Sequence, residues 1–220
     1  MNSEAKSREA VCALGAKLAA RGLCPGTSGN ISVRLGDGHL ITPTDACLGF
    51  LDPGEISHVD PQGAPVSGGR PSKTLTLHRR IYAADKEARC VIHTHSTHLV
   101  ALTLGQSGYS DDLLPPITPY FVMKVGHVPL VPYHRPGDPR VADLVASAIA
   151  RNASRGSPIR AVMLARLGPM VWHDSPAAAM ATLEELEETA KLWISSDHRD
   201  TQALTEAEIE ELRRSFGARW

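Results

Sequence analysis

The sequence of 220 residues has no excess of charge of either sign, because 23 Lys and Arg face 24 Asp and Glu and leave a formal net charge of -1. Without a basic surplus, electrostatics give no reason to expect nucleic acid or an anionic membrane as a partner. No apolar run approaches the roughly 18 residues that a membrane-spanning helix needs. The charged N-terminal segment lacks an apolar stretch, so we expect no secretory signal and a cytoplasmic location.

Cysteine and aromatic residues are also scarce. The four cysteines (Cys12, Cys24, Cys47 and Cys90) are scattered and form no Cys-x-x-Cys pair, which favours reduced, partly buried thiols over a disulfide framework. Aromatic residues make up only 5%, so the core must consist mainly of Val, Leu, Ile and Ala. The length predicts one domain over 1–220, and the near-neutral charge weakly favours self-association.

Short apolar segments alternate with longer amphipathic ones along the chain. Helical spacing predicts helices over 4–22, 72–85, 97–104, 138–149, 175–194 and 205–216, and strands are predicted at 31–33, 40–41, 56–59, 90–92, 128–132, 161–164 and 170–172. Ser72 and Asp138 are the expected N-caps of two helices, and Gly168-Pro169 is the expected turn between the last two strands. Two prolines restrict 128–132 to a sheet edge. This order predicts a layered α/β domain in which several connections permit antiparallel pairing.

The segment Cys90-Val-Ile-His-Thr-His-Ser96 carries the strongest chemical signal. Residues two apart on a strand project from the same face, so His93 and His95 can converge on one point. Two neutral imidazoles there suit Zn²⁺ or another borderline divalent ion, with an affinity that falls as the histidines become protonated. A pair of hydrogen-bonded histidines at a strand end is the structural alternative. His98 is expected to lie on the following helix.

Three polar segments have the composition of a phosphate site. Gly26-Thr-Ser-Gly-Asn30 combines glycines, hydroxyls and an amide, and such loops expose backbone N–H groups to an anion. Thr42-Pro-Thr44-Asp45 adds hydroxyls at a strand end. Pro71-Ser72-Lys73 places a hydroxyl and an ammonium at an expected helix N-terminus, where anions are favoured. Each segment alone is more often a turn or a helix cap than a phosphate site.

Taken in order along the chain, Gly26–Asn30, Ile41–Thr44, Pro71-Ser72 and His93-Thr-His95-Ser96 resemble the class II aldolase/adducin family over about residues 8–195. The resemblance implies a three-layer α/β/α domain with a mostly antiparallel central sheet, followed by a C-terminal helix at about 205–216. It also implies a homotetramer with active sites between subunits, a divalent metal ion (typically zinc) and a phosphorylated sugar-like substrate. Within the family, 119–126 and 129–138 resemble the 3-oxo-tetronate 4-phosphate decarboxylases.

By position, the resemblance assigns roles to individual residues. Asn30, Thr44 and Ser72 would contact the substrate phosphate, and Gly29 would shape that loop. His93 and His95 would hold the metal. Tyr120 would reach into a neighbouring subunit's site as a proton donor.

Two positions depart from the family pattern. Thr74 stands where a catalytic Glu is usual, so Thr74, Lys73 and Tyr120 are the catalytic candidates. Leu167 stands where the third metal-binding His is usual, and leucine cannot coordinate a metal. Either substrate and water complete the metal shell, or another residue does. The possible replacements are His127, His134 and His173.

These departures favour one reaction within the family. Aldol chemistry uses a carboxylate to move protons, whereas a β-keto acid already holds an electron sink for the bond to CO₂. Polarisation of that carbonyl by a metal, Lys73 or Arg166 is then sufficient. We therefore expect metal-assisted decarboxylation of 3-oxo-tetronate 4-phosphate to dihydroxyacetone phosphate and CO₂. The alternatives are a sugar-phosphate aldolase or epimerase, and a non-catalytic adducin-like relative.

Two further patterns allow a structural interpretation. The acidic run Glu184, Glu185, Glu187 and Glu188 has the helical spacing of a solvated or intersubunit face. Arg135 and Asp138 flank Pro136-Gly137, which indicates a loop with an internal ion pair; a substrate contact for Arg135 is the alternative.

Overall fold

A mixed sheet of eight strands forms the centre of the computed structural model, which describes residues 3–106, 108–196 and 200–220. The strand order is β4-β3-β2-β1-β5-β8-β7-β6. The strands are β1 (Asn30–Leu35), β2 (Gly38–Ile41), β3 (Ser57–Val59), β4 (Pro65–Ser67), β5 (Cys90–His93), β6 (Leu130–Val131), β7 (Ala161–Leu164) and β8 (Gly168–His173). Among the described strands, β6 and β7 pair in parallel and every other neighbouring pair is antiparallel. The expected mostly antiparallel sheet is confirmed.

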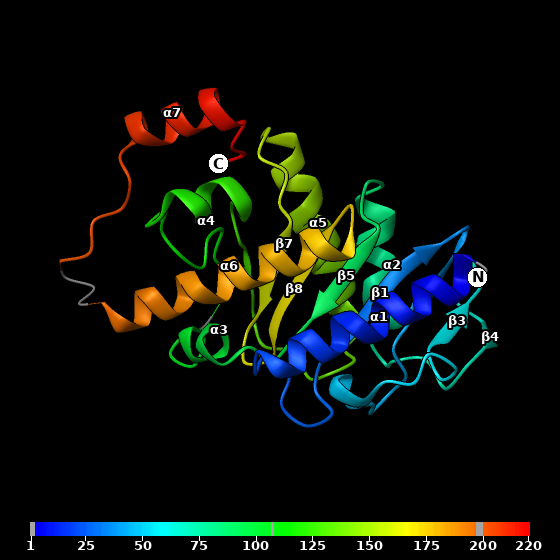
Figure 1. Cartoon of the computed structure of the whole chain (residues 1–220). Helices are drawn as coiled ribbons and strands as arrows, with labels where there is room; N and C mark the ends of the chain where they lie inside the picture. Colours follow the sequence, from blue (N-terminus) through cyan, green and yellow to red (C-terminus); the bar gives the residue numbers. More distant parts are fainter. Residues whose placement is uncertain (1–2, 107, 197–199) are drawn as a thin grey trace.

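Helices cover both faces of this sheet, which confirms the three-layer arrangement (Figure 1). They are α1 (Ser3–Ala20), α2 (Leu75–Ala84), α3 (Thr97–Leu102), α4 (Pro119–Lys124), α5 (Arg140–Ser154), α6 (Pro176–Ser195) and α7 (Glu206–Phe216), with a 3-10 turn at Leu48–Phe50. Helices α1, α3, α4 and α6 lie on one face, α2 and α5 pack together on the other, and α7 packs on α4. In the described part of the chain, no helix is both long enough and apolar enough to cross a bilayer.

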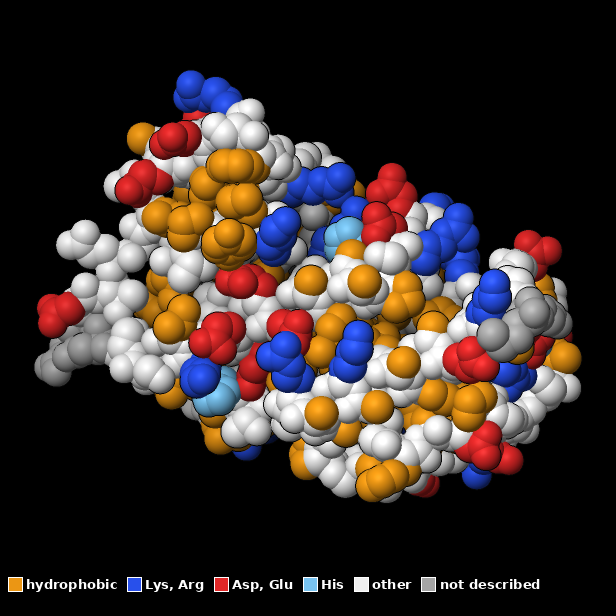
Figure 2. Space-filling view, viewed as in Figure 1, with side chains coloured by type: hydrophobic (Ala, Val, Ile, Leu, Met, Phe, Trp, Pro, Cys, Tyr) orange, Lys and Arg blue, Asp and Glu red, His pale blue; other side chains and the backbone are white. Residues whose placement is uncertain are grey.

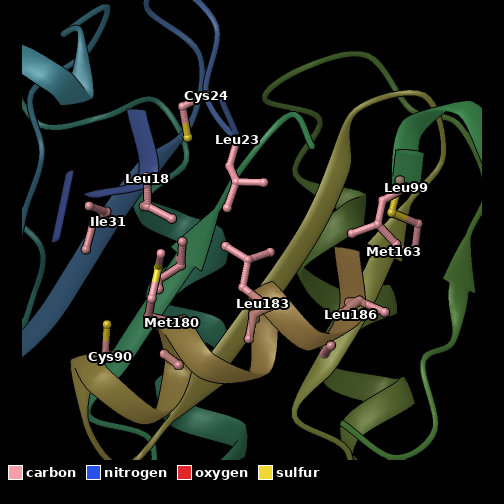
Figure 3. Close-up of a cluster of buried hydrophobic side chains, with 14 of the residues drawn as sticks. Leu18, Leu23, Cys24, Ile31, Cys90, Leu99, Met163, Met180, Leu183 and Leu186 are labelled. Carbon is pink, nitrogen blue, oxygen red and sulfur yellow. The ribbon is translucent and has the colours of Figure 1, made fainter. Parts of the chain in front are cut away.

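Alternation along the central strands divides the apolar residues between two cores. Cys90 and Ile92 of β5 face the α1/α6 core, and Val91 between them faces the α2/α5 core. Figure 3 shows the first core, where Leu18 of α1 and Leu183 of α6 pack over the sheet. By the same alternation, the residue after Ile92, His93, belongs to the α2/α5 face. The site described below lies on that face.

Most of the expected element boundaries hold. The hairpin of β1 and β2, the edge position of β6, and the start of α6 after its N-cap Ser175 are confirmed. Thr205 caps α7 in a reciprocal capping box with Glu208. His98 lies on α3, as expected.

The acidic run on α6 is only partly a solvated face. Glu187 is largely buried, and its carboxylate accepts hydrogen bonds from the backbone N–H groups of His98 and Leu99 and from His98 Nδ1. The orphan N–H groups of a helix start require acceptors, and here one carboxylate from a different helix supplies them. Glu187 therefore joins α6 to the N-terminus of α3.

Two expected N-caps are displaced by one or two residues. Helix α2 begins at Leu75 with Thr74 as N-cap, so Ser72 lies before the helix, where its backbone N–H donates to Thr42 O. Pairing of this segment with the strand end after β2 competes with helix formation and delays the helix. Helix α5 begins at Arg140, although Asp138 still accepts a hydrogen bond from the Arg140 N–H.

The expected turn at Gly168-Pro169 is wrong. Both residues lie in β8, where Gly168 pairs with Leu164 and Pro169 pairs with Met163. Residues 165–167 make the turn instead, and Arg166 adopts a positive φ of 64°. Glycine is required at 168 because its φ is 126° and a Cβ there would lie 1.9 Å from Thr94 O.

We expect Gly168→Ala to destabilise the fold far more than Gly156→Ala. Gly156 also has a positive φ, of 81°, but a Cβ at that position meets nothing within 4 Å. The control should therefore cost about 1 kcal/mol of unfolding free energy from backbone strain alone. Gly168→Ala adds a steric clash and should cost about 3 kcal/mol or more. Urea unfolding measures both values, and equal losses would contradict the prediction.

Candidate active site

A cavity of about 340 Å³ opens at one end of β1 and β5, on the α2/α5 face. Its lining includes Gly29, Asn30, Thr44, Ser72, Lys73, Thr74, His93 and His95, which are all the expected phosphate and metal residues and two of the three catalytic candidates. Tyr120, the third, does not line the cavity of its own chain; it is exposed on α4. The fold thus brings together segments that are up to about 65 residues apart in sequence.

Strand register explains why the glycine loop and the histidine pair meet. Asn30 is paired with His93 across the β1–β5 ladder, and His93 is paired with Met170 across the β5–β8 ladder. Asn30 ends the glycine loop and His93 ends β5, so one antiparallel register places both at the same sheet end. The pocket therefore joins the expected anion loop to the expected metal pair.

Gly29 is needed for this close approach. Its φ is 82°, and a Cβ would lie 2.8 Å from both Cys24 Sγ and His93 O. The loop can lie against the end of β5 only without a side chain there. Burial raises the pKa of the Cys24 thiol to about 12, so the thiol stays neutral and acts as a packing group beneath the loop.

His93 and His95 lie next to each other, with ring centroids 5.1 Å apart and ring planes at 66°. His93 Nδ1 lies 2.9 Å from Pro169 O. A carbonyl can only accept, so Nδ1 carries the proton and Nε2 keeps its lone pair. Burial lowers the pKa of His93 to about 4 and also lowers that of His95. Both rings are therefore neutral near pH 7, the state in which imidazole binds a metal.

The donor set for a metal is limited to these two rings. The described residues contain no group of three or more His, Cys, Asp and Glu side chains placed to hold an ion. Leu167 lines the pocket without a donor atom. Two neutral imidazoles, one oriented by a backbone carbonyl, would suit a divalent ion, which would need its remaining ligands from other groups.

The expected replacements for the third histidine are wrong. None of His127, His134 and His173 lines the pocket. Each instead has Nδ1 against a carboxylate: Asp112, Asp138 and Asp174 respectively. Spacing in sequence could not decide this, because these partners lie from one residue (His173–Asp174) to 15 residues (His127–Asp112) away along the chain.

The start of α2 supplies further polar groups to the pocket. Ser72 Oγ lies 2.9 Å from Thr74 Oγ1, so the residue at the usual glutamate position is a hydroxyl bonded to a neighbouring hydroxyl. Lys73 Nζ lies 3.4 Å from Asp45 at the exposed rim. The N-terminus of a helix carries partial positive charge, so this corner favours an anion.

Two arginines behave differently from expectation. Arg166 does not line the cavity of its own chain, and its guanidinium donates to Leu104 O. The internal ion pair of Arg135 with Asp138 is also wrong, since Asp138 pairs with Arg140. Arg135 lines the pocket, and among the described residues its side chain has no hydrogen-bond or ion-pair partner.

His78 lies behind the pocket against Asn30, and the sequence analysis did not single it out. Its Nε2 lies 2.6 Å from Asn30 Oδ1, and its Nδ1 lies 2.8 Å from Ser32 Oγ. Full burial lowers its pKa to about 3. His78 follows Thr74 by four residues, which places both on one face of α2, and this spacing was the available signal.

Comparison with known proteins agrees with this geometry. Residues 9–194 match the sequence profile of the Class II Aldolase and Adducin N-terminal domain. A protein from Cupriavidus necator named 3-oxo-tetronate 4-phosphate decarboxylase is 55% identical over 100% of both chains. A protein of the same name from Escherichia coli is 42% identical over 96% of each chain. The crystal structure of YgbL from Klebsiella pneumoniae superposes with a TM-score of 0.88 at 40% identity, covering 97% of this chain and 100% of that one.

The chain therefore belongs to the class II aldolase and adducin family. The expected family, and within it the similarity to the 3-oxo-tetronate 4-phosphate decarboxylases, are confirmed. The roles of individual residues stay predictions.

Buried neutral histidines should make the fold sensitive to acid, and His39 allows a test outside the pocket. His39 is stacked on Tyr82, and neither ring nitrogen has a hydrogen-bond partner among the described residues. Burial, together with Arg34 and Arg79, lowers its pKa to about 4. Between about pH 6.5 and 4 the unfolded chain binds this proton and the folded chain does not, so stability falls as pH falls.

We therefore expect His39→Leu to reduce the loss of unfolding free energy between pH 7 and pH 4.5, by up to about 3 kcal/mol. Urea unfolding at the two pH values measures it. An identical loss in wild type and variant would contradict the prediction.

Proposed function

We propose that the protein is a cytoplasmic carboxy-lyase that converts a 3-oxo-tetronate 4-phosphate to dihydroxyacetone phosphate and CO₂. The observation that carries the proposal is the cavity that joins an anion-binding corner to a pair of neutral imidazoles, with Thr74 where a proton-moving carboxylate is usual. Relatives up to 55% identical over the whole chain bear the corresponding name.

The chemistry explains why a hydroxyl at position 74 is tolerated. The bond between C1 and C2 breaks, CO₂ leaves, and the electron pair moves from C2 into the 3-oxo group as an enediolate. A proton then adds to C2 and gives dihydroxyacetone phosphate. No C–H bond is broken, so the reaction needs a group that stabilises the developing oxyanion and a proton donor, but no carboxylate base.

The anion-binding corner holds the phosphate. Asn30, Thr44 and Ser72 supply side-chain donors, and Gly29 lets the loop backbone approach the ligand. The substrate also carries a carboxylate, so its total negative charge is large. Lys73 and Arg135, both on the pocket wall, partly neutralise that charge.

His93 and His95 hold the metal ion. The family is generally dependent on a divalent metal, and imidazole ligands favour zinc among the common ions. When bound, such an ion supplies Lewis-acid polarisation of the 3-oxo oxygen. The protein's own contribution is to keep both rings neutral by burial and to orient His93 through Pro169 O.

Tyr120 protonates C2 in the site of a neighbouring subunit of a homotetramer. In a single chain Tyr120 is 62% exposed and away from the cavity. Other large apolar side chains, including Leu192 and Phe216, are also exposed. Figure 2 shows hydrophobic side chains gathered around α7, at the upper left of the view. Surface of this kind is typical of contacts between subunits.

The second candidate is a non-catalytic, adducin-like protein. Leu167 and Thr74 favour it, because both replace residues that usually act in the family's chemistry. An aldolase or epimerase of a sugar phosphate is less compatible with Thr74, since aldol chemistry moves protons through a carboxylate. Retention of both histidines and of the polar corner favours the decarboxylase over a decayed site.

The purified protein should release CO₂ from 3-oxo-tetronate 4-phosphate generated in situ, at least about a hundredfold faster than buffer. Metal removal by a chelator should slow the release, and added zinc should restore it. The unphosphorylated 3-oxo-tetronate is the matched control and should react poorly, because it lacks the group that anchors it. No release with or without metal would exclude the decarboxylase, and release that ignores the chelator would exclude only the metal.

Tyr120→Phe should lower kcat by about a hundredfold or more, because it removes the proton donor. Mixing it before refolding with a Ser72→Ala variant, which lacks one of the phosphate donors, should give more activity than either variant alone. In random hybrids about a quarter of the sites combine an intact Ser72 with a neighbour's intact Tyr120. Activity that stays at the level of the separate variants would contradict a shared site.

A further inference from the structure

A line of buried hydrogen bonds runs from Tyr82 to Asn30 behind the phosphate corner. Asn30 and Ser32 are two residues apart on β1 and so share the face toward α2. Helix α2 presents His78 and Tyr82, which are four residues apart, to that face. Tyr82 Oη lies 2.9 Å from Ser32 Oγ, Ser32 Oγ lies 2.8 Å from His78 Nδ1, and His78 Nε2 lies 2.6 Å from Asn30 Oδ1. Ser32, His78 and Tyr82 are 0–2% exposed, and Asn30 is 7% exposed at the pocket.

The direction of each hydrogen bond follows from the atoms. Asn30 Oδ1 can only accept, so His78 Nε2 donates to it. Neutral histidine carries one ring proton, so Nδ1 must accept from the Ser32 hydroxyl. Once it donates to His78, the Ser32 hydroxyl can only accept from Tyr82 Oη, whose single proton is shared between Ser32 Oγ and Ser32 O, each 2.9 Å away. With Oδ1 engaged by His78, the remaining atom of the amide, Nδ2, is the one available to a ligand.

The opposite arrangement would also close the network. If His78 carried its proton on Nδ1, Nε2 would accept from Asn30 Nδ2, and Oδ1 would be left for the ligand. A carbonyl oxygen repels a phosphate, whereas an N–H group binds it. The tautomer of one buried imidazole therefore decides whether this corner attracts or repels an anion.

We propose that His78 is a positioning residue that donates from Nε2 to Asn30 Oδ1 and so holds the Asn30 amide with its N–H groups toward the substrate phosphate. This inference rests on the phosphate site proposed above. His78 touches no substrate; it acts through Asn30. In this arrangement Ser32 donates to Nδ1 and so supports the tautomer with the proton on Nε2.

The variants separate this role from a structural one. His78→Gln keeps an amide N–H donor near the position of Nε2 and should bind inorganic phosphate within about threefold of wild type. His78→Leu removes the donor and should weaken phosphate binding, and raise KM for the substrate, by about tenfold or more, with a much smaller change in kcat. Ser32→Ala should lie between them. Ile81→Ala is the matched control, because Ile81 is fully buried in the same helix outside the network, and it should lower stability without changing phosphate affinity.

The wild-type protein tests the tautomer directly. With ¹⁵N-labelled histidine, long-range proton–nitrogen correlation should show the His78 proton on Nε2, both free and with inorganic phosphate. A proton on Nδ1, or equal phosphate affinity in wild type and His78→Leu, would overturn the inference while leaving the phosphate site intact. Equal weakening in Ile81→Ala and His78→Leu would assign a structural role instead and would overturn it as well. Failure of the wild type to bind phosphate at all would remove the proposed site, and this inference with it.

Discussion

Antiparallel pairing between β1 and β5 sets the geometry on which every other feature of the pocket depends. It pairs Asn30 with His93. The β5–β8 ladder in turn pairs His93 with Met170, so the three residues lie side by side across the sheet. A shift of one residue would turn either Asn30 or His93 toward the α1/α6 core, which would separate the two and bury a polar group in apolar surroundings. The alternation of apolar residues on both strands therefore fixes the register that the site requires as well as the register of the fold.

Burial then determines the charge state of the pocket. Desolvation disfavours the imidazolium, so the pKa of His93 is about 4 and that of His78 about 3. Neutral rings have one donor and one acceptor each, and the surrounding carbonyl, hydroxyl and amide groups decide which nitrogen is which. His93 donates from Nδ1 to Pro169 O and keeps the Nε2 lone pair for a metal, whereas His78 donates from Nε2 to Asn30 Oδ1. Burial keeps both histidines neutral, but in our proposals His93 offers a lone pair to a metal and His78 donates a hydrogen bond to the Asn30 amide.

The departures at Thr74 and Leu167 concern the same pocket but different parts of the chemistry. Thr74 removes a base, which a β-keto acid does not need. Leu167 removes a metal ligand and adds an apolar side chain to the wall of the pocket. An apolar wall near a departing carboxylate disfavours the charged ground state more than the neutral CO₂ that leaves, so it is compatible with decarboxylation. Together these replacements narrow the chemistry of a fold that supports several reactions.

The sequence alone determined most of the elements, although not β4 or α4. It also determined the hairpin, the edge strand and the residues expected in the pocket, because apolar periodicity, caps and short polar motifs are local signals. The tertiary structure decided the rest. It showed that His127, His134 and His173 each contact a carboxylate and do not line the pocket, that the Arg166 guanidinium donates to Leu104 O, and that Gly168 belongs to a strand. It also brought His78 to Asn30 across 48 residues. A side chain's partner depends on strand register and helix placement, which are collective properties of the packed chain, and no local pattern contains them.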